Sequence, residues 1–111
     1  MSGLFVTGPM FLAILDSYDP GHTQTGAAWL AALDGGQTPV TSNYVVAEAC
    51  GLIQSRLGVG ALRAFVEDVL PVVDVRMVTP AQHATALVAL VTARRADLTL
   101  VDCTSSLVMR A

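Results

Sequence analysis

The sequence contains no lysine, and arginine supplies all six of its basic residues against nine acidic ones. The formal net charge is −3 at pH 7. A chain of this composition has no basic tail or stripe that could hold nucleic acid by charge alone. Any contact with nucleic acid must therefore be local.

Cysteine is scarce as well. The two cysteines, Cys50 and Cys103, lie far apart and show neither CxxC nor zinc-type spacing. This usage does not indicate a disulfide framework, and it suits small, buried apolar residues in a reducing compartment. We therefore expect a cytoplasmic protein.

Long hydrophobic runs are also missing. The segment LFVTGPMFLAIL at 4–15 has about the length of a signal-peptide core, but no basic residue precedes it and a Gly-Pro pair interrupts it. Acidic residues break the later apolar stretches well short of the roughly 18 to 20 residues that a membrane span needs. We expect neither secretion nor membrane insertion.

What is present suits one folded domain over residues 1–111. Apolar residues make up 53% of the chain, and its mean hydropathy is +0.59, which is enough to build a core. The pattern predicts strands at 3–6, 38–42, 72–78 and 98–101. It predicts helices at 9–18, within 19–36, at 43–57, 61–70 and 80–95, and from 102 onward. Strands that alternate with helices indicate an α/β fold with a parallel sheet.

Glu48 is the most informative residue in the sequence. Its helical neighbours three and four residues away are Tyr44, Val45, Gly51 and Leu52, so its carboxylate projects from an apolar or small stripe. A charge in such a place needs a partner. Two interpretations remain open, a salt bridge to arginine at the edge of the fold and a metal-binding or catalytic carboxylate.

Asp102 follows the predicted strand at 98–101 and begins the last helix. It could serve only as a helix N-cap, for which Asp is a preferred residue. Ligand sites of parallel α/β sheets, however, lie at the carboxyl ends of strands, where the helix of Glu48 also begins. Both acids could then face one cleft, and two carboxylates with water form a minimal Mg²⁺ environment.

Other polar residues are weaker candidates. His22 and His83 fit surface or capping positions better than catalytic ones, and Asp97 precedes its predicted strand at the end opposite a site. Arg94 and Arg95 could contact phosphate, but they also complement the dipole at a helix end. No GxGxxG, P-loop, HExxH or GxSxG pattern occurs, so these nucleotide-binding, zinc-protease and hydrolase motifs give no support.

Several segments, taken in order, resemble one known family over nearly the whole chain. They are FVTGPMFLAILD, DPGH, AAWLAAL, TSNYVVAEA and LTLVDCTSSLVM. This series is similar to that of the PIN-domain ribonucleases, in particular the VapC-type toxins of bacterial toxin–antitoxin pairs. The resemblance implies a doubly wound parallel sheet of about four strands flanked by helices, with the family's last strand missing.

The resemblance also implies a function. It predicts an acidic pocket that holds Mg²⁺ or Mn²⁺, endonucleolytic cleavage of RNA, a homodimer and a cognate antitoxin as partner. It places the catalytic and metal-binding roles on Glu48 and Asp102. The bound cation would lower the pKa of a water molecule and stabilise charge on the phosphate.

The chain departs from the family pattern at its first acid. Family members read Val-Asp-Thr-Gly-Pro where this chain passes directly from Val6 to Thr7, so the Asp is deleted or, on another alignment, replaced at Thr7. A hydroxyl is a much weaker ligand for a hard cation than a carboxylate. We therefore expect an impaired ribonuclease that an Asp inserted between Val6 and Thr7 would partly restore. A catalytically inactive module that binds antitoxin or RNA is the alternative, and an α/β domain of unrelated specificity is a third possibility.

Overall fold

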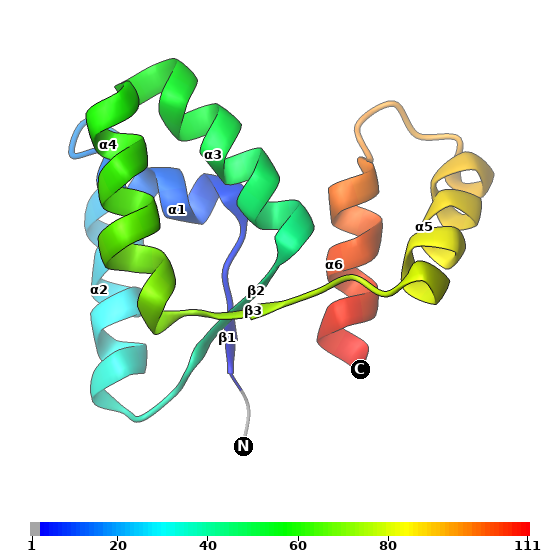
Figure 1. The fold of residues 1–111 in the computed structure, drawn as a ribbon, viewed down its shortest axis with the longest axis horizontal. Helices are drawn as coiled ribbons and strands as arrows, with labels where there is room; N and C mark the ends of the chain where they lie inside the picture. The colour runs from blue at the N-terminus through cyan, green and yellow to red at the C-terminus, as the bar shows by residue number, and fades with distance from the viewer. Residues whose placement is uncertain (1–2) are drawn as a thin grey trace.

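The computed structural model describes residues 3–111 (Figure 1). Its strands are β1 (Leu4–Phe5), β2 (Pro39–Ser42) and β3 (Asp74–Arg76). Its α-helices are α1 (Gly8–Leu15), α2 (His22–Asp34), α3 (Asn43–Leu57), α4 (Val59–Ala64), α5 (Pro80–Ala93) and α6 (Leu100–Arg110). A π-helical turn (Phe65–Val69) and a 3-10 turn (Leu70–Val72) follow α4 directly.

The strands form one parallel sheet in the order β1-β2-β3. Leu4 pairs with Pro39, and Val40 pairs with Asp74. Helices cover both sides of this sheet: α1 to α4 gather on one side, and α5 and α6 lie on the other (Figure 1). The predicted α/β class and doubly wound parallel arrangement are therefore confirmed.

One predicted strand is wrong. Residues 98–101 form no strand, because Thr99 is the N-cap of α6 and the helix begins at Leu100. The sheet among residues 3–111 consequently has three strands and not about four. A short apolar run can belong to a buried strand or to a buried helix, and here the capping bonds of Thr99 favour the helix.

Other boundaries also differ from the prediction; the helix expected at 9–18, for example, ends at Leu15. The helix expected at 61–70 is divided into α4 and the π-helical turn. The strand expected at 72–78 shrinks to β3, because the 3-10 turn that contains Pro71 extends to Val72. Proline fixes its φ angle and has no N–H, so it suits such a turn better than a strand interior.

The main core lies between the sheet and the helices α1 and α3. Its buried members are Val6, Phe11, Leu12, Val45, Ala49, Ile53 and Phe65. The rings of Phe11 and Phe65 meet edge to face, with their centroids 5.0 Å apart. This packing holds the inner face of α3 against α1.

The ends of α3 are fixed as the sequence predicts. The Ser42 hydroxyl accepts a hydrogen bond from Val45 N at 3.2 Å, which identifies Ser42 as the N-cap. Gly58 ends the helix at φ +91°, a conformation that a side chain would strain.

Both cysteines are free thiols. No helix among residues 3–111 combines the length and apolar character required to cross a bilayer.

Candidate acidic site

Glu48 and Asp102 line a single cavity of about 350 Å³. Glu48 comes from α3 on one side of the sheet, and Asp102 comes from the first turn of α6 on the other. The remaining lining residues are Phe5, Thr7, Gly8, Pro9, Val45, Thr99, Val101, Ser105 and Met109. The structure thus brings together the two acids that the sequence singles out.

The packing of α3 against α1 positions Glu48. Val45 and Ala49, on either side of it in the sequence, are buried in the core, so the carboxylate is held at the margin of that core. Glu48 Oε1 lies so close to Gly8 that a Cβ on residue 8 would overlap it. Glycine at the first position of α1 therefore gives the carboxylate the space that it occupies.

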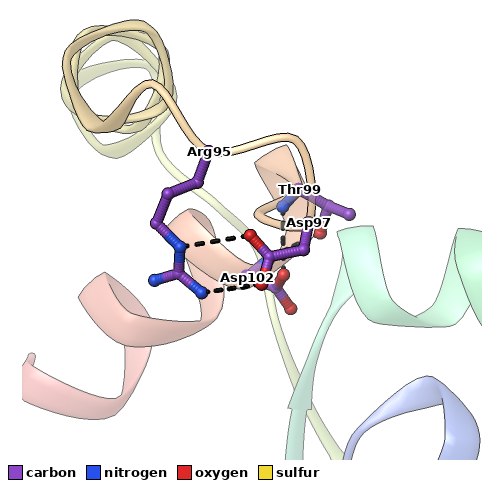
Figure 2. A network of polar contacts seen from close by, with 4 residues as sticks. All are labelled: Arg95, Asp97, Thr99 and Asp102. Atoms are coloured by element: carbon purple, nitrogen blue, oxygen red, sulfur yellow. Dashed lines mark hydrogen bonds and ion pairs between the residues drawn. The ribbon is translucent and has the colours of Figure 1, made fainter.

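Asp102 is held by a reciprocal capping box with Thr99 (Figure 2). Thr99 N donates to Asp102 Oδ2 at 3.0 Å, and Asp102 N donates to Thr99 Oγ1 at 3.1 Å. Asp102 is therefore not the N-cap itself, which is Thr99, but the third residue of the helix, whose side chain completes the capping box. Because the capping bond uses Oδ2, the second carboxylate oxygen is available to a ligand at the cavity.

The electrostatics of the two acids are coupled. Burial raises the pKa of Glu48 above its ordinary value, and the negative charge of Asp102 raises it further. No arginine offsets this effect, because the ion pairs among residues 3–111 are Arg63–Glu67, Arg76–Asp74 and Arg95–Asp97. The salt-bridge interpretation of Glu48 is therefore wrong.

A hydroxyl stands at the end of β1 where a third acid is expected. Thr7 lines the cavity, and its Oγ1 accepts from Met10 N at 3.4 Å as the N-cap of α1. Val6 is fully buried in the core, with its N–H bonded to Val40 O at 2.8 Å. Among residues 3–111, no three His, Cys, Asp or Glu side chains gather closely enough to hold a metal ion.

The two histidines make structural contacts. His22 Nδ1 donates to Ala13 O at 2.7 Å, which ties the start of α2 to α1. The His83 ring on α5 forms a hydrogen bond with the Tyr44 hydroxyl on α3. Neither histidine lines the acidic cavity.

Arg95 and Asp97 form an exposed pair beside Asp102 (Figure 2). Arg95 Nε donates to Asp97 Oδ1 at 3.2 Å, and Arg95 Nη2 donates to Asp97 Oδ2 at 3.0 Å. The bond from Arg95 lowers the pKa of Asp97. Asp97 raises the pKa of Arg95, and the charge of Asp102 adds to this effect. Arg95 therefore lies within electrostatic reach of the site.

Thr7 was singled out from the sequence as the place of the absent acid, but the hydroxyl groups of Thr99 and Ser105 were not. A signal for Thr99 was available, because Thr-x-x-Asp just before an apolar run resembles a capping box. Ser105 gave no comparable signal. Its place in the cavity depends on how α6 packs, which local spacing does not specify.

Comparison with known proteins gives one informative likeness. No family model matches the chain, and no curated protein matches it. Among solved structures, the VapC20 toxin of Mycobacterium tuberculosis, which cleaves the sarcin-ricin loop, superimposes with a TM-score of 0.83 at 29% sequence identity. The match covers 97% of this chain and 82% of that one.

The likeness agrees with the structure at two levels. It covers nearly all of the chain, so it includes the sheet and the helices on both of its sides. It also agrees with the ordered series of motifs that contains Glu48 and Asp102. The chain therefore resembles the VapC-type PIN-domain toxins in both fold and sequence.

Proposed function

We propose that this chain is a metal-dependent endoribonuclease toxin of a type II toxin–antitoxin pair, impaired in the form given by this sequence. The observation that carries the proposal is the meeting of Glu48 and Asp102 in one cavity between α3 and α6. The structural likeness to a toxin that cleaves the sarcin-ricin loop supports RNA as the substrate.

The residues present fit a weakly held divalent cation. Mg²⁺ prefers oxygen ligands, and protein sites often supply only one or two carboxylates, with water and substrate phosphate completing the shell. Glu48 and Asp102 are such a pair, and their mutual repulsion favours a cation between them. Mn²⁺ accepts the same oxygen ligands.

Each side chain has a distinct part in this mechanism. A bound cation would lower the pKa of a water molecule and stabilise negative charge on the phosphate. Asp102, fixed by Thr99, would orient one ligand position. Glu48 would hold a second ligand position from α3. No side chain needs to form a covalent bond with RNA.

The alternative is a module that binds antitoxin or RNA without cutting. The absence of a cluster of three potential ligands among residues 3–111 favours it. A third carboxylate increases affinity for a hard cation, and here Thr7 offers a hydroxyl instead. Metal binding separates the two functions, because a binding module has no need of the cation.

The test compares the parent chain with Glu48→Gln and Asp102→Asn. The second variant keeps Thr99 as the N-cap and keeps an amide oxygen that can accept from Thr99 N, while it loses the negative charge. We expect each variant to lower Mn²⁺ affinity in calorimetric titration at least roughly tenfold and to abolish residual RNA cleavage. Glu67→Gln is the matched control, because Glu67 is an exposed acid that pairs with Arg63. Equal metal affinity in all four chains would favour the binding module.

Partners and location extend the proposal. We expect a cognate antitoxin, a homodimer and action in the cytoplasm. Exposed apolar residues on α5 support association with another protein surface, since Leu87, Val88 and Val91 lie within about one turn of each other and are all accessible. Within α5 only Ala86 is buried.

A further inference from the structure

A second hollow adjoins the acidic cavity. It has a volume of about 590 Å³ and is lined by Asn43, Tyr44, Ala47, Glu48 and Val101. Glu48 and Val101 also line the first cavity. The two hollows therefore form a continuous surface between α3 and α6, with the Glu48 carboxylate at their junction.

Tyr44 is the aromatic residue that lines this second hollow. It precedes Glu48 by four residues on α3, so both side chains lie on one face of the helix, about one turn or 5.4 Å apart. The other aromatic residues do not line this hollow. Phe5 lines the first cavity, Phe11 and Phe65 are fully buried, and Trp29 packs against the core. Tyr18 is 94% exposed and lies outside both hollows.

A contact across two helices holds the Tyr44 ring. Its hydroxyl forms a hydrogen bond with His83 Nδ1 on α5. The two rings also meet edge to face, with their centroids 5.9 Å apart and their planes at 68°. Because an edge-to-face contact occupies at most one face of the phenol ring, at least one face has no aromatic partner in this pair. The ring is fixed before any ligand arrives.

The bond to His83 ties α3 to α5, but it does not require an aromatic ring that also lines the second hollow. The neighbouring Asn43 has a structural role, because its Oδ1 accepts from Val78 N at 2.8 Å and ties α3 to the segment after β3. Tyr44 belongs to no buried core cluster among residues 3–111. A held but accessible aromatic ring beside a phosphate-processing site suits nucleobase stacking, the main way proteins engage unpaired RNA bases.

We propose that Tyr44 is a substrate-binding platform on which an unpaired RNA base stacks, next to the phosphate that a cation at Glu48 and Asp102 would hold, and that His83 is the positioning residue that fixes this platform. The proposal rests on the ribonuclease function and specifies its substrate as RNA with an unstacked base at the cleavage site. One helical turn separates platform and carboxylate, so the stacked base belongs to the nucleotide at or next to the scissile bond.

The experiment measures RNA binding apart from cleavage. All chains carry Glu48→Gln to suppress cutting, and Mg²⁺ is present throughout. The probes are a short fluorescein-labelled single-stranded RNA, read by anisotropy, and the same RNA with 2-aminopurine, whose fluorescence falls when the base stacks. Tyr44→Leu removes the stacking face but keeps apolar bulk, and Tyr44→Phe keeps the face but loses the bond to His83. Tyr18→Leu is the matched control, because Tyr18 is the other tyrosine and lies outside both hollows.

We expect Tyr44→Leu to weaken RNA binding about tenfold or more and to abolish the 2-aminopurine signal, since stacking of a base on an aromatic ring is worth about that factor. Tyr44→Phe and His83→Ala should weaken binding by roughly threefold and keep part of the signal. Tyr18→Leu should change nothing. Thermal unfolding, followed by circular dichroism, shows that each variant is folded.

Two results would overturn the platform. One is a folded Tyr44→Leu chain that binds RNA and quenches 2-aminopurine as its parent does. The other is a parent chain that shows no stacking signal with any RNA. Cleavage by the chain with Glu48 intact is measured separately. If bases stack on Tyr44 but RNA is not cut in the presence of metal, the platform is supported and the nuclease function is refuted. If RNA is cut but no base stacks on Tyr44, the nuclease function is supported and the platform is refuted.

Discussion

At the residue scale, Glu48 carries its charge against two unfavourable influences, partial burial and the nearby Asp102. Both raise its pKa, so the folded chain binds a proton at this position more tightly than the unfolded chain does. The contribution of Glu48 to stability is therefore greatest below the ordinary carboxyl pKa and is lost as the pH rises through the raised value. At neutral pH the metal-free chain is less stable because of Glu48.

Replacing the Glu48 carboxylate by a neutral amide removes this destabilisation. We expect Glu48→Gln to raise the midpoint of thermal unfolding at pH 7 by roughly 2–4 °C, since a partly exposed carboxyl contributes less than about 1 kcal/mol. The gain should shrink toward zero near pH 3, where both chains are neutral at residue 48. Calorimetric scans in EDTA at several pH values measure the difference. A gain that does not depend on pH would mean that the charge is not its cause.

The position of Thr7 makes it the residue to exchange for the absent acid. We expect Thr7→Asp to raise Mg²⁺ or Mn²⁺ affinity roughly tenfold or more and to increase RNA cleavage, because it adds a hard ligand to the cavity of Glu48 and Asp102. Asp caps helices as well as Thr does, so α1 keeps its N-cap. Calorimetric titration and a cleavage assay give the two readouts.

Val6→Asp is the contrast. It would place a carboxylate in the core, where Val6 is fully buried, so we expect lower stability and no gain in metal affinity. If Val6→Asp binds the metal and Thr7→Asp does not, the position of the missing acid has been misassigned. An Asp inserted between these residues is a less clean test, because it would reverse the faces of Leu4 and Phe5 in β1.

At the element scale, α6 depends on its capping box for both its start and the position of Asp102. We expect Thr99→Ala to lower the free energy of unfolding by about 1 kcal/mol in urea titration, whereas Thr99→Ser should cost little. Metal affinity should also fall in Thr99→Ala, since Asp102 loses the N-cap that orients it. Unchanged metal affinity in a destabilised Thr99→Ala chain would show that the cap serves the fold alone.

The helices α3 and α6 show which parts of the fold can be predicted from the sequence and which cannot. Long segments with clear caps, such as α3 between Ser42 and Gly58, can be predicted closely because local chemistry determines their ends. Residues 98–101 could not be assigned from their apolar run, because four such residues suit a strand and a helix equally well. The hydrogen bonds between Thr99 and Asp102 decide in favour of the helix. In the sequence they appear only as the spacing Thr-x-x-Asp.

The candidate site was predictable to a similar degree. Glu48 could be identified from its apolar helical face. Asp102 was singled out because it follows a predicted strand at 98–101, but this reason is wrong, since those residues form no strand and Asp102 lies in the first turn of α6. The contacts of Glu48 with Gly8 and of Tyr44 with His83 could not be predicted, because they arise from packing between helices.

At the scale of the whole molecule, the exposed apolar residues of α5 are the surface through which the proposed homodimer would form. Val88 and Val91 lie near one another on that helix, and Val88 is 68% exposed. We expect the double variant Val88→Glu and Val91→Glu to convert a dimer to a monomer in light scattering without loss of helical content, because charges oppose burial in an interface. Val59→Glu is the matched control, since Val59 on α4 is also 68% exposed. A parent chain that is monomeric at all concentrations would contradict the homodimer.

The placement of the two acids on opposite sides of the sheet has a consequence for how the molecule holds together. Glu48 lies on α3, which precedes β3 in the chain, and Asp102 lies on α6, which follows it. Figure 1 shows these two helices on opposite sides of the sheet. Both cysteines are free, so no disulfide joins these helices. A cation shared by the two carboxylates would act as a reversible cross-link between α3 and α6, formed only when metal is abundant. The ion proposed to assist RNA cleavage would then also determine how tightly α3 and α6 are held together.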